Sequence, residues 1–451
     1  MKVANGEFLS RNGNDVIAKF LEGTGGVELW YNNVKKFDTV ETGIQVTGEV
    51  AASQDYPNFR PTLDLNFAAE KKLDPRITYS RSGPASYTDE FGKVVLVGDN
   101  TPRFDHDLTT RESKGLLIEE SRTNFMKYSD EFAIASGNTG GNWDSIGGAS
   151  DYTRVSDTTE TKDPTGITNH ASKITFVSGN ATLRGYWYSG AANGAVTKTY
   201  SVYLKRATSN TTTVIIDIGD QGATSCTLTD EWKRYSVTTS SAGNGNFVDM
   251  TLTTGASTPY YAWGCQIEAG GFATSYIPTS TAAVARGADT AFIDGQHFTD
   301  LYNVPEGTFV LKQSVDDTST SNQWAWGVEK STNRGGFFNG LGFRVGGGGA
   351  GYVGAWYNNN GSTSAFLNMN AGATVNIPFV SAFAYKVNDM AATTSGITVL
   401  TDTSASIATA GEFDRFSLGS YHYDSMSTGH IQRVMYYRKR LPNSQLVTLT
   451  S

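Results

Sequence analysis

Short runs that alternate apolar and polar residues recur through most of this chain, and turns rich in Gly, Asn and Ser separate them. Tyr200, Val202 and Leu204 make one such run, and the next, around Val214 and Ile216, follows after a polar turn. A period of two places every second side chain on the same face of a strand. Many short strands with turn residues between them predict β-sandwiches.

The composition favours the same all-β fold class. The 451 residues include 49 Gly and 11 Pro, and charged residues make up only 18%. This mixture suits short strands and disfavours long helices, coiled coils and helical repeats. The net charge is −8 and the chain has no basic block, so we expect no nucleic-acid partner.

Targeting signals and cysteines add little information about the fold or the function. The first residues contain no apolar stretch, and no apolar run approaches the length of a membrane span, so we expect neither a signal peptide nor membrane insertion. The protein is expected to fold in the cytoplasm where it is made. Cys226 and Cys265 are too few for a disulfide framework or a zinc site. They are either two small buried side chains or a single disulfide pair.

Two sequence runs bracket the middle of the chain. Gly115–Asn124 reads GLLIEESRTN, and Tyr261–Glu268 reads YAWGCQIE and is followed by FATSYIPT over Phe272–Thr279. This bracket resembles a module common in bacteriophage tail fibre and receptor-binding proteins, whose core is similar to a carbohydrate-binding jelly roll. The resemblance implies a carbohydrate-binding-module-like jelly roll over residues 116–285.

Residues 1–50 are predicted to form a short hairpin segment. Gly26–Tyr31 alternates, Asn32 and Asn33 make a turn, Val34–Phe37 returns, and Thr42–Val50 alternates again. The segment resembles the virion-attachment part of trimeric phage fibres. A strand pair this short cannot bury a core alone. We therefore expect a homotrimer whose N-terminal segments interdigitate. These segments are also expected to contact other virion proteins. The alternative is a hairpin on a monomer.

The remaining residues divide into three parts. Residues 51–115 are predicted as an extended connector, residues 286–295 as a linker and residues 296–451 as a second sandwich. The strand Gly429–Tyr437 and a closing helix after Pro442 resemble the end of concanavalin-like and laminin-G-like domains. In the connector, three arginines stand beside acidic residues, and we expect structural ion pairs there. These residues are Arg76, Arg81, Arg103, Asp74 and Asp105.

No catalytic constellation stands out, and we expect no enzyme activity. The chain has no G-x-S-x-G motif and no histidine pair at ligand spacing; His422 and His430 are interpreted as polar loop residues. Candidate carboxylates are many, but sequence alone cannot pair them across a groove. No cofactor is predicted, although Glu268 is a candidate calcium ligand because related jelly rolls often bind calcium.

Two aromatic clusters are candidate glycan-binding sites, because sugars stack on aromatic rings and amides bond their hydroxyl groups. In a strand, Tyr186 and Tyr188 would point to one face and Trp187 to the other, so at least one of these rings should face outward. Trp324 and Trp326 are expected to share a strand face and to lie in the core. The candidate residues are Tyr186, Trp187 and Tyr188 in the jelly roll, and Trp356, Tyr357 and Asn358 in the second sandwich.

These observations lead to three hypotheses for function. The first is a phage virion fibre protein, assembled in the host cytoplasm and released by lysis, which binds host-surface polysaccharide through many weak sites. The second is a structural fibre that decorates a capsid or connects a tail without binding glycan. The third is a polysaccharide-degrading tail spike, which is disfavoured because no β-helix repeat is visible.

Overall fold

The structure is a computed structural model with two compact units, Met1–Asn58 and Phe59–Ser451. It describes 34 strands and three short helices, which confirms the all-β prediction. The described residues are 6–9, 16–21, 26–31, 34–40, 43–46, 60–132, 143–146, 152–155, 158–176, 182–187, 196–240, 246–253, 258–318, 323–332, 340–345, 353–359, 362–369, 373–395, 398–420 and 427–451.

The N-terminal unit contains one antiparallel sheet whose strands follow chain order. The predicted hairpin corresponds to β3 and β4, and β1 and β2 extend it beyond what the alternation indicates. Lys35 links the sheet through ion pairs with Glu28 at 3.2 Å and Asp38 at 2.9 Å. The strands are β1 (Gly6–Leu9), β2 (Val16–Phe20), β3 (Val27–Tyr31), β4 (Val34–Val40) and β5 (Gly43–Val46).

The predicted jelly roll contains two five-stranded antiparallel sheets, and their facing apolar side chains form one core. Cys226 and Cys265 are buried free thiols in this core. In sheet order, one sheet is β13 (Trp143–Ile146), β16 (Thr182–Tyr186), β21 (Phe247–Leu252), β18 (Thr213–Ile218) and β19 (Ala223–Thr227), and the other is β14 (Tyr152–Val155), β15 (Ser172–Phe176), β22 (Tyr260–Ala269), β17 (Lys198–Arg206) and β20 (Lys233–Thr239).

The second sandwich has an eight-stranded and a seven-stranded sheet around the largest core. The first sheet is β10 (Phe104–His106), β11 (Ser113–Ile118), β34 (Gly429–Tyr437), β25 (Glu306–Val315), β30 (Phe379–Lys386), β31 (Met390–Thr394) and β32 (Leu400–Asp402), with β6 (Leu63–Leu65) beside β34. The second is β29 (Ser362–Asn368), β28 (Val353–Asn359), β27 (Gly340–Val345), β26 (Gln323–Glu329), β33 (Arg415–Leu418), β24 (Thr290–Asp294) and β7 (Thr78–Ser80).

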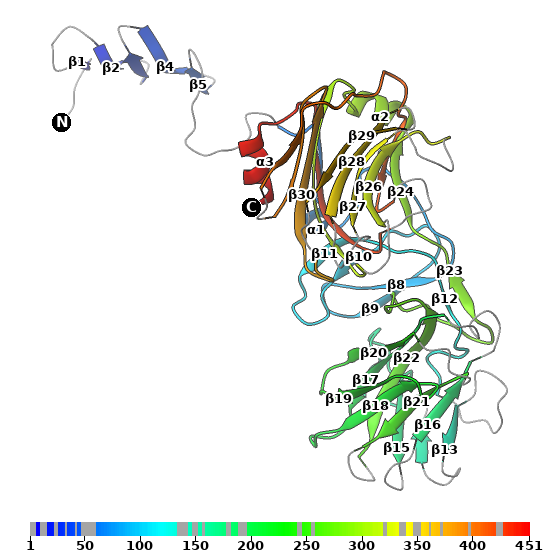
Figure 1. The fold of residues 1–451 in the computed structure, drawn as a ribbon. Helices are drawn as coiled ribbons and strands as arrows, with labels where there is room; N and C mark the ends of the chain where they lie inside the picture. Colours follow the sequence, from blue (N-terminus) through cyan, green and yellow to red (C-terminus); the bar gives the residue numbers. More distant parts are fainter. Residues whose placement is uncertain are drawn as a thin grey trace. The chain divides into compact units, whose positions relative to one another are not determined.

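The second sandwich is discontinuous in sequence, and the jelly roll is inserted into it. The segment predicted as an extended connector supplies β6, β7, β10 and β11, and the predicted linker supplies β24. Strand β12 (Arg122–Asn124) leads into the inserted sandwich, and β23 (Val284–Arg286) leads out of it, antiparallel to β12. In Figure 1 the cyan strands β10 and β11 accordingly lie in the same sandwich as the yellow and orange strands.

The hairpin and helices complete the fold. Strand β8 (Ala85–Thr88) pairs with β9 (Val94–Val97). The helices are α1 (Phe67–Glu70), α2 (Gly295–Leu301) and α3 (Asn443–Thr450), and α3 begins directly after Pro442, where the sequence places it. Among the described residues, no helix has the length and apolar character needed to cross a lipid bilayer.

A buried ionic cluster, here called the junction network, joins the inserted sandwich to the discontinuous one. Arg103 donates to Glu119 and to Asp289, each at 2.5 Å, and Arg286 lies 2.8 Å from Glu119. Ser275 of the inserted sandwich donates its backbone N–H and its hydroxyl to Glu119, both at 2.7 Å. Structural ion pairs are therefore present as predicted, but Arg103 pairs with Glu119 and Asp289 rather than with Asp105.

Candidate functional site

The predicted cluster in the inserted sandwich is divided between surface and core. Trp187 is only 2% exposed and belongs to the core, so it is not available to a ligand. Tyr186 is half-buried at the end of β16, with its ring edge-on to Phe247 at 6.3 Å. Tyr188 lies outside the described residues.

The second predicted cluster is divided in the same way. Tyr357 is fully buried, and its hydroxyl accepts a hydrogen bond from the backbone N–H of Ala408 at 2.8 Å. Trp356 points to the opposite, outer face of β28 and is half-buried. Its indole N–H donates to the side-chain oxygen of Asn358, which fixes the orientation of the ring. Asn358 therefore acts on Trp356 rather than presenting a free carbonyl oxygen.

Trp356 belongs to a group of side chains on the outer face of the seven-stranded sheet, here called the aromatic platform. Its ring centroid lies 4.7 Å from that of Phe366 and 6.5 Å from that of Trp324, and the guanidinium of Arg344 lies 5.3 Å from it. Phe366 is 39% exposed. These residues come from the adjacent strands β26, β27, β28 and β29, so the sheet holds the rings in one surface.

A β-bulge explains why Trp324 belongs to this platform. The register of β26 against β27 shifts between Trp324 and Trp326, so the two side chains point to opposite faces. Trp326 is 1% exposed and lies in the core, whereas Trp324 is half-buried on the outer face. The prediction that both tryptophans share a core face is therefore wrong for Trp324, because the alternation of side chains breaks at the bulge.

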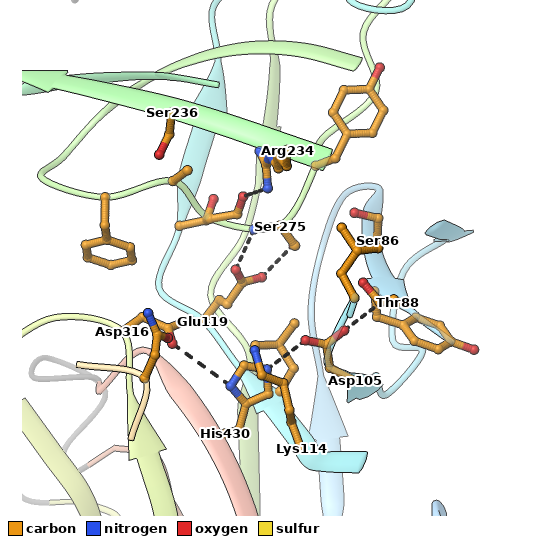
Figure 2. A pocket seen from close by; sticks show the side chains of 18 of the residues that line it. Ser86, Thr88, Asp105, Lys114, Glu119, Arg234, Ser236, Ser275, Asp316 and His430 are labelled. Atoms are coloured by element: carbon orange, nitrogen blue, oxygen red, sulfur yellow. Dashed lines mark hydrogen bonds and ion pairs between the residues drawn. The ribbon is translucent and has the colours of Figure 1, made fainter. Parts of the chain in front are cut away.

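A second candidate site is a cleft of about 480 Å³ lined by both sandwiches (Figure 2). From the discontinuous sandwich come residues of β10, β11 and β34, together with Asp316 directly after β25, and the β8–β9 hairpin adds residues of β8. From the inserted sandwich come residues of β17 and β20 and the segment 271–276. The junction network lies beside the cleft, because Glu119 and Ser275 belong to both.

One side of the cleft carries a histidine between two carboxylates. His430 donates from Nε2 to Asp105 at 2.8 Å, and its Nδ1 lies 4.0 Å from Oδ1 of Asp316. Burial alone would raise the pKa of Asp105, but the hydrogen bond and charge of His430 outweigh it and lower that pKa. Burial raises the pKa of Asp316. The two carboxyl groups thus differ in acidity although the same histidine lies between them.

The opposite side of the cleft is formed by the inserted sandwich. Arg234 donates to the carbonyl oxygen of Thr274 at 2.5 Å and to the hydroxyl of Ser201 at 2.8 Å, and its guanidinium lies 5.5 Å from the ring of Tyr203. Ser236 is exposed on the same strand and lines the cleft. This side therefore offers hydroxyl groups and the guanidinium of Arg234, which donates only to uncharged oxygens in the contacts given above.

The carboxylate of Glu268, the candidate calcium ligand, is occupied by hydrogen bonds within the protein. Its side chain is fully buried and accepts hydrogen bonds from Gln266 at 2.8 Å and from the N–H and hydroxyl of Thr274 at 2.9 and 2.7 Å. Arg122 lies 4.0 Å away. These donors neutralise and occupy the carboxylate, so Glu268 stabilises the turn that follows β22.

Among the described residues, one group of three carboxylates has ligand atoms within 4.8 Å of one another: Asp217, Asp220 and Asp249. Arg184 donates to Asp249 at 2.7 and 2.6 Å and lies 3.7 Å from Asp220. Burial raises the pKa of both Asp217 and Asp249. Arg184 supplies one positive charge to the group, and its short contacts are with Asp249.

No protein-family model and no curated protein matches the chain. Among solved structures, the CBM40 of Ruminococcus gnavus IT-sialidase bound to alpha2,3 sialyllactose is 19% identical over 34% of this chain and 86% of that chain, with a TM-score of 0.30. Domain 4 of AbnA, a GH43 extracellular arabinanase from Geobacillus stearothermophilus, in complex with arabinotriose, is 17% identical over 40% of this chain and 82% of that chain, with a TM-score of 0.30. Likenesses this weak decide nothing about the ligand of this chain.

The cleft residues are absent from the sequence-based candidates for a simple reason. His430 and Asp105 are 325 positions apart and meet only because β11 pairs with β34. Asp105 lies in a segment predicted as a connector, and His430 in a strand that carries no ligand motif. A carboxylate and a histidine in two strands far apart in sequence give no signal until the pairing of the strands is known.

Proposed function

We propose that this chain is a bacteriophage virion fibre protein that binds host-surface glycans during adsorption. The observation that carries the proposal is the aromatic platform, in which Trp356 and Phe366 form part of an outer sheet surface. The apolar face of a pyranose stacks on such rings, and their quadrupoles attract its polarised C–H groups. The sequence resemblance of the bracketed module to phage receptor-binding proteins supports the biological setting.

Binding relies on side chains that are held in place before the sugar arrives, and it involves no chemical step. The indole of Trp356 is held by Asn358, and Arg344 lies near its ring, so little side-chain freedom is lost when a sugar stacks on it. A single stacked sugar residue gives weak affinity. Several copies in one fibre, and many fibres on one particle, raise the effective concentration and hence the avidity. Assembly in the host cytoplasm and release by lysis remain part of this proposal.

The test uses the fluorescently labelled full chain, intact cells of candidate host bacteria and their purified surface polysaccharide as competitor. Wild-type protein should bind saturably, and the polysaccharide should remove it. Trp356→Ala should lower the affinity of each site for the polysaccharide by up to about tenfold, because a stacking contact of one ring contributes about 0.5–1.5 kcal/mol. Phe91→Ala is the matched control, since Phe91 is 71% exposed outside the platform and should bind normally.

A structural fibre without glycan binding is the second candidate, favoured by the apolar surface of the N-terminal sheet. Leu29, Tyr31 and Val34 are 44%, 68% and 49% exposed there. If the folded protein binds no cells of a host that the phage infects, the platform is a contact between virion proteins. If Trp356→Ala binds cells as tightly as wild type, the platform is not the glycan site.

A further inference from the structure

The cleft between the two sandwiches has features of a ligand site that are independent of the aromatic platform. Its two sides belong to different sandwiches, and the junction network between them is buried and multiply hydrogen-bonded. Arg103 and Arg286 are both fully buried and both lie within 2.8 Å of Glu119. Strands β8, β10, β11, β17, β20 and β34 and the buried junction network thus form much of the cleft, which lowers the cost of ordering a bound molecule.

Several polar atoms in the side chains that line the cleft lack hydrogen-bond partners within the protein. Nδ1 of His430, which is 4% exposed, and Oδ1 of Asp316 have no partner, and at 4.0 Å they do not bond each other. His106 donates from Nδ1 to the carbonyl oxygen of Thr88 at 3.1 Å, and its Nε2 has no partner. Buried polar atoms normally find partners, so their gathering around one cavity points to a polar occupant.

The charges around the cleft favour an uncharged occupant. Asp105, Asp107 and Asp316 contribute three carboxylates, and Lys114 and Arg234 contribute two cations. Glu119 is neutralised by Arg103 and Arg286. An anion would meet the three carboxylates, and a cation would meet Lys114 and Arg234. A neutral molecule with many hydroxyl groups satisfies donors and acceptors of both kinds.

Size and ring placement fit the same class of ligand. A volume of about 480 Å³ lies within the range of small-molecule sites, which is about 300–1,000 Å³. Tyr87 and Phe272 add aromatic surface to a lining that is otherwise rich in hydroxyl groups. We infer that the cleft binds a neutral sugar residue, with Asp316 and Lys114 bonding its hydroxyl groups. The inference concerns the same class of ligand as the proposed function, but it does not require the aromatic platform to bind.

The test measures binding of free sugars to the full chain by saturation-transfer NMR and titration calorimetry at millimolar concentrations. The neutral probes are D-glucose, D-galactose and N-acetyl-D-glucosamine; N-acetylneuraminic acid and D-glucosamine are the anionic and cationic comparisons. At least one neutral sugar should bind, and Asp316→Asn should weaken its binding by about tenfold, as expected for a lost hydrogen bond to a charged group.

A second variant fills the cleft without touching the buried histidine. Ser236→Phe places a ring at the cleft wall and should abolish binding. Ser225→Phe is its control, because Ser225 is exposed on β19 of the same sandwich and does not line the cleft. Trp356→Ala should leave this binding unchanged, which separates the cleft from the platform.

The inference is overturned if no neutral sugar binds the wild-type protein, or if only the charged probes bind. Unchanged binding by Ser236→Phe, with a circular dichroism spectrum like that of wild type, would also overturn it. A loss of binding in Ser225→Phe equal to that in Ser236→Phe would place the ligand elsewhere.

Discussion

At the scale of single residues, Glu119 has the most consequential environment. Glu119 is 2% exposed, whereas the side chain of the adjacent Glu120 is 39% exposed. Sequence alone cannot identify the partners of Glu119, because Arg286 and Ser275 lie more than one domain-length of chain away. Burial alone would raise the pKa of Glu119, but Arg286 and Arg103 outweigh it and hold that pKa well below its usual range.

Glu119→Gln should lower the free energy of unfolding by about 3–5 kcal/mol, because it leaves two arginines buried without their shared carboxylate. Urea denaturation at neutral pH measures this loss, and Glu120→Gln, at a more exposed position, should change stability by less than about 1 kcal/mol. An equal effect of both substitutions would mean that the junction network contributes no more than a surface pair.

The same residue predicts a pH dependence. Because folding lowers the pKa of Glu119, its ionised form stabilises the fold above the unfolded pKa of about 4.3, and this stabilisation is lost as the pH falls toward the folded pKa. The stability difference between wild type and Glu119→Gln should therefore be largest near neutral pH and shrink below about pH 4. A difference that stays constant with pH would exclude this ionisation as its source.

At the scale of elements, the alternation identifies strands well and their partners poorly. The runs at Tyr200–Leu204, at Val214 and Ile216, and at Gly429–Tyr437 all lie in strands, as their pattern indicates. Alternation cannot reveal that β6 pairs with β34, since that choice depends on packing across the whole domain. It also cannot reveal the bulge that turns Trp324 outward, because an extra residue in a strand leaves no mark on composition.

The pairing of β11 with β34 depends on one glycine. Gly115 has φ +86°, and a Cβ there would lie 2.3 Å from the carbonyl oxygen of Ile431. Gly115→Ala should therefore destabilise the protein by at least about 2 kcal/mol, from backbone strain and from the forced separation of the strands. Gly98→Ala, where no atom lies within 4 Å, is the control and should change stability by less than about 0.5 kcal/mol. Thermal unfolding of both variants distinguishes these outcomes.

At the scale of the whole molecule, the two units differ in how they bury apolar surface. The Phe59–Ser451 unit contains all the hydrophobic clusters found among the described residues, and none of their members lies in the described part of the Met1–Asn58 unit. Among the side chains described in the N-terminal sheet, none is both apolar and buried, and a sheet with few buried apolar side chains gains little stability from its own residues. This contrast supports the proposal that the N-terminal sheets of several chains pack together.

The full chain should therefore be a trimer in solution, and a chain limited to residues 59–451 should be a folded monomer. Size-exclusion chromatography with light scattering measures both masses. A monomeric full chain would contradict the proposed role of the N-terminal unit. A trimeric shortened chain would place the subunit contact in the sandwiches instead.

The insertion of one sandwich into the other has a consequence for the evolution of such a chain. The inserted sandwich begins and ends at neighbouring, paired strands, since Asn124 is opposite Val284 in the β12–β23 ladder. Recombination at these two points would replace the entire inserted sandwich and leave both sheets of the discontinuous sandwich complete. The incoming module would have to supply a hydroxyl and a backbone N–H in the positions of those of Ser275, because both donate hydrogen bonds to Glu119. The inserted sandwich, and with it one side of the cleft, is thus exchangeable as a unit within a constraint set by one buried carboxylate, whereas the aromatic platform stays with the discontinuous sandwich.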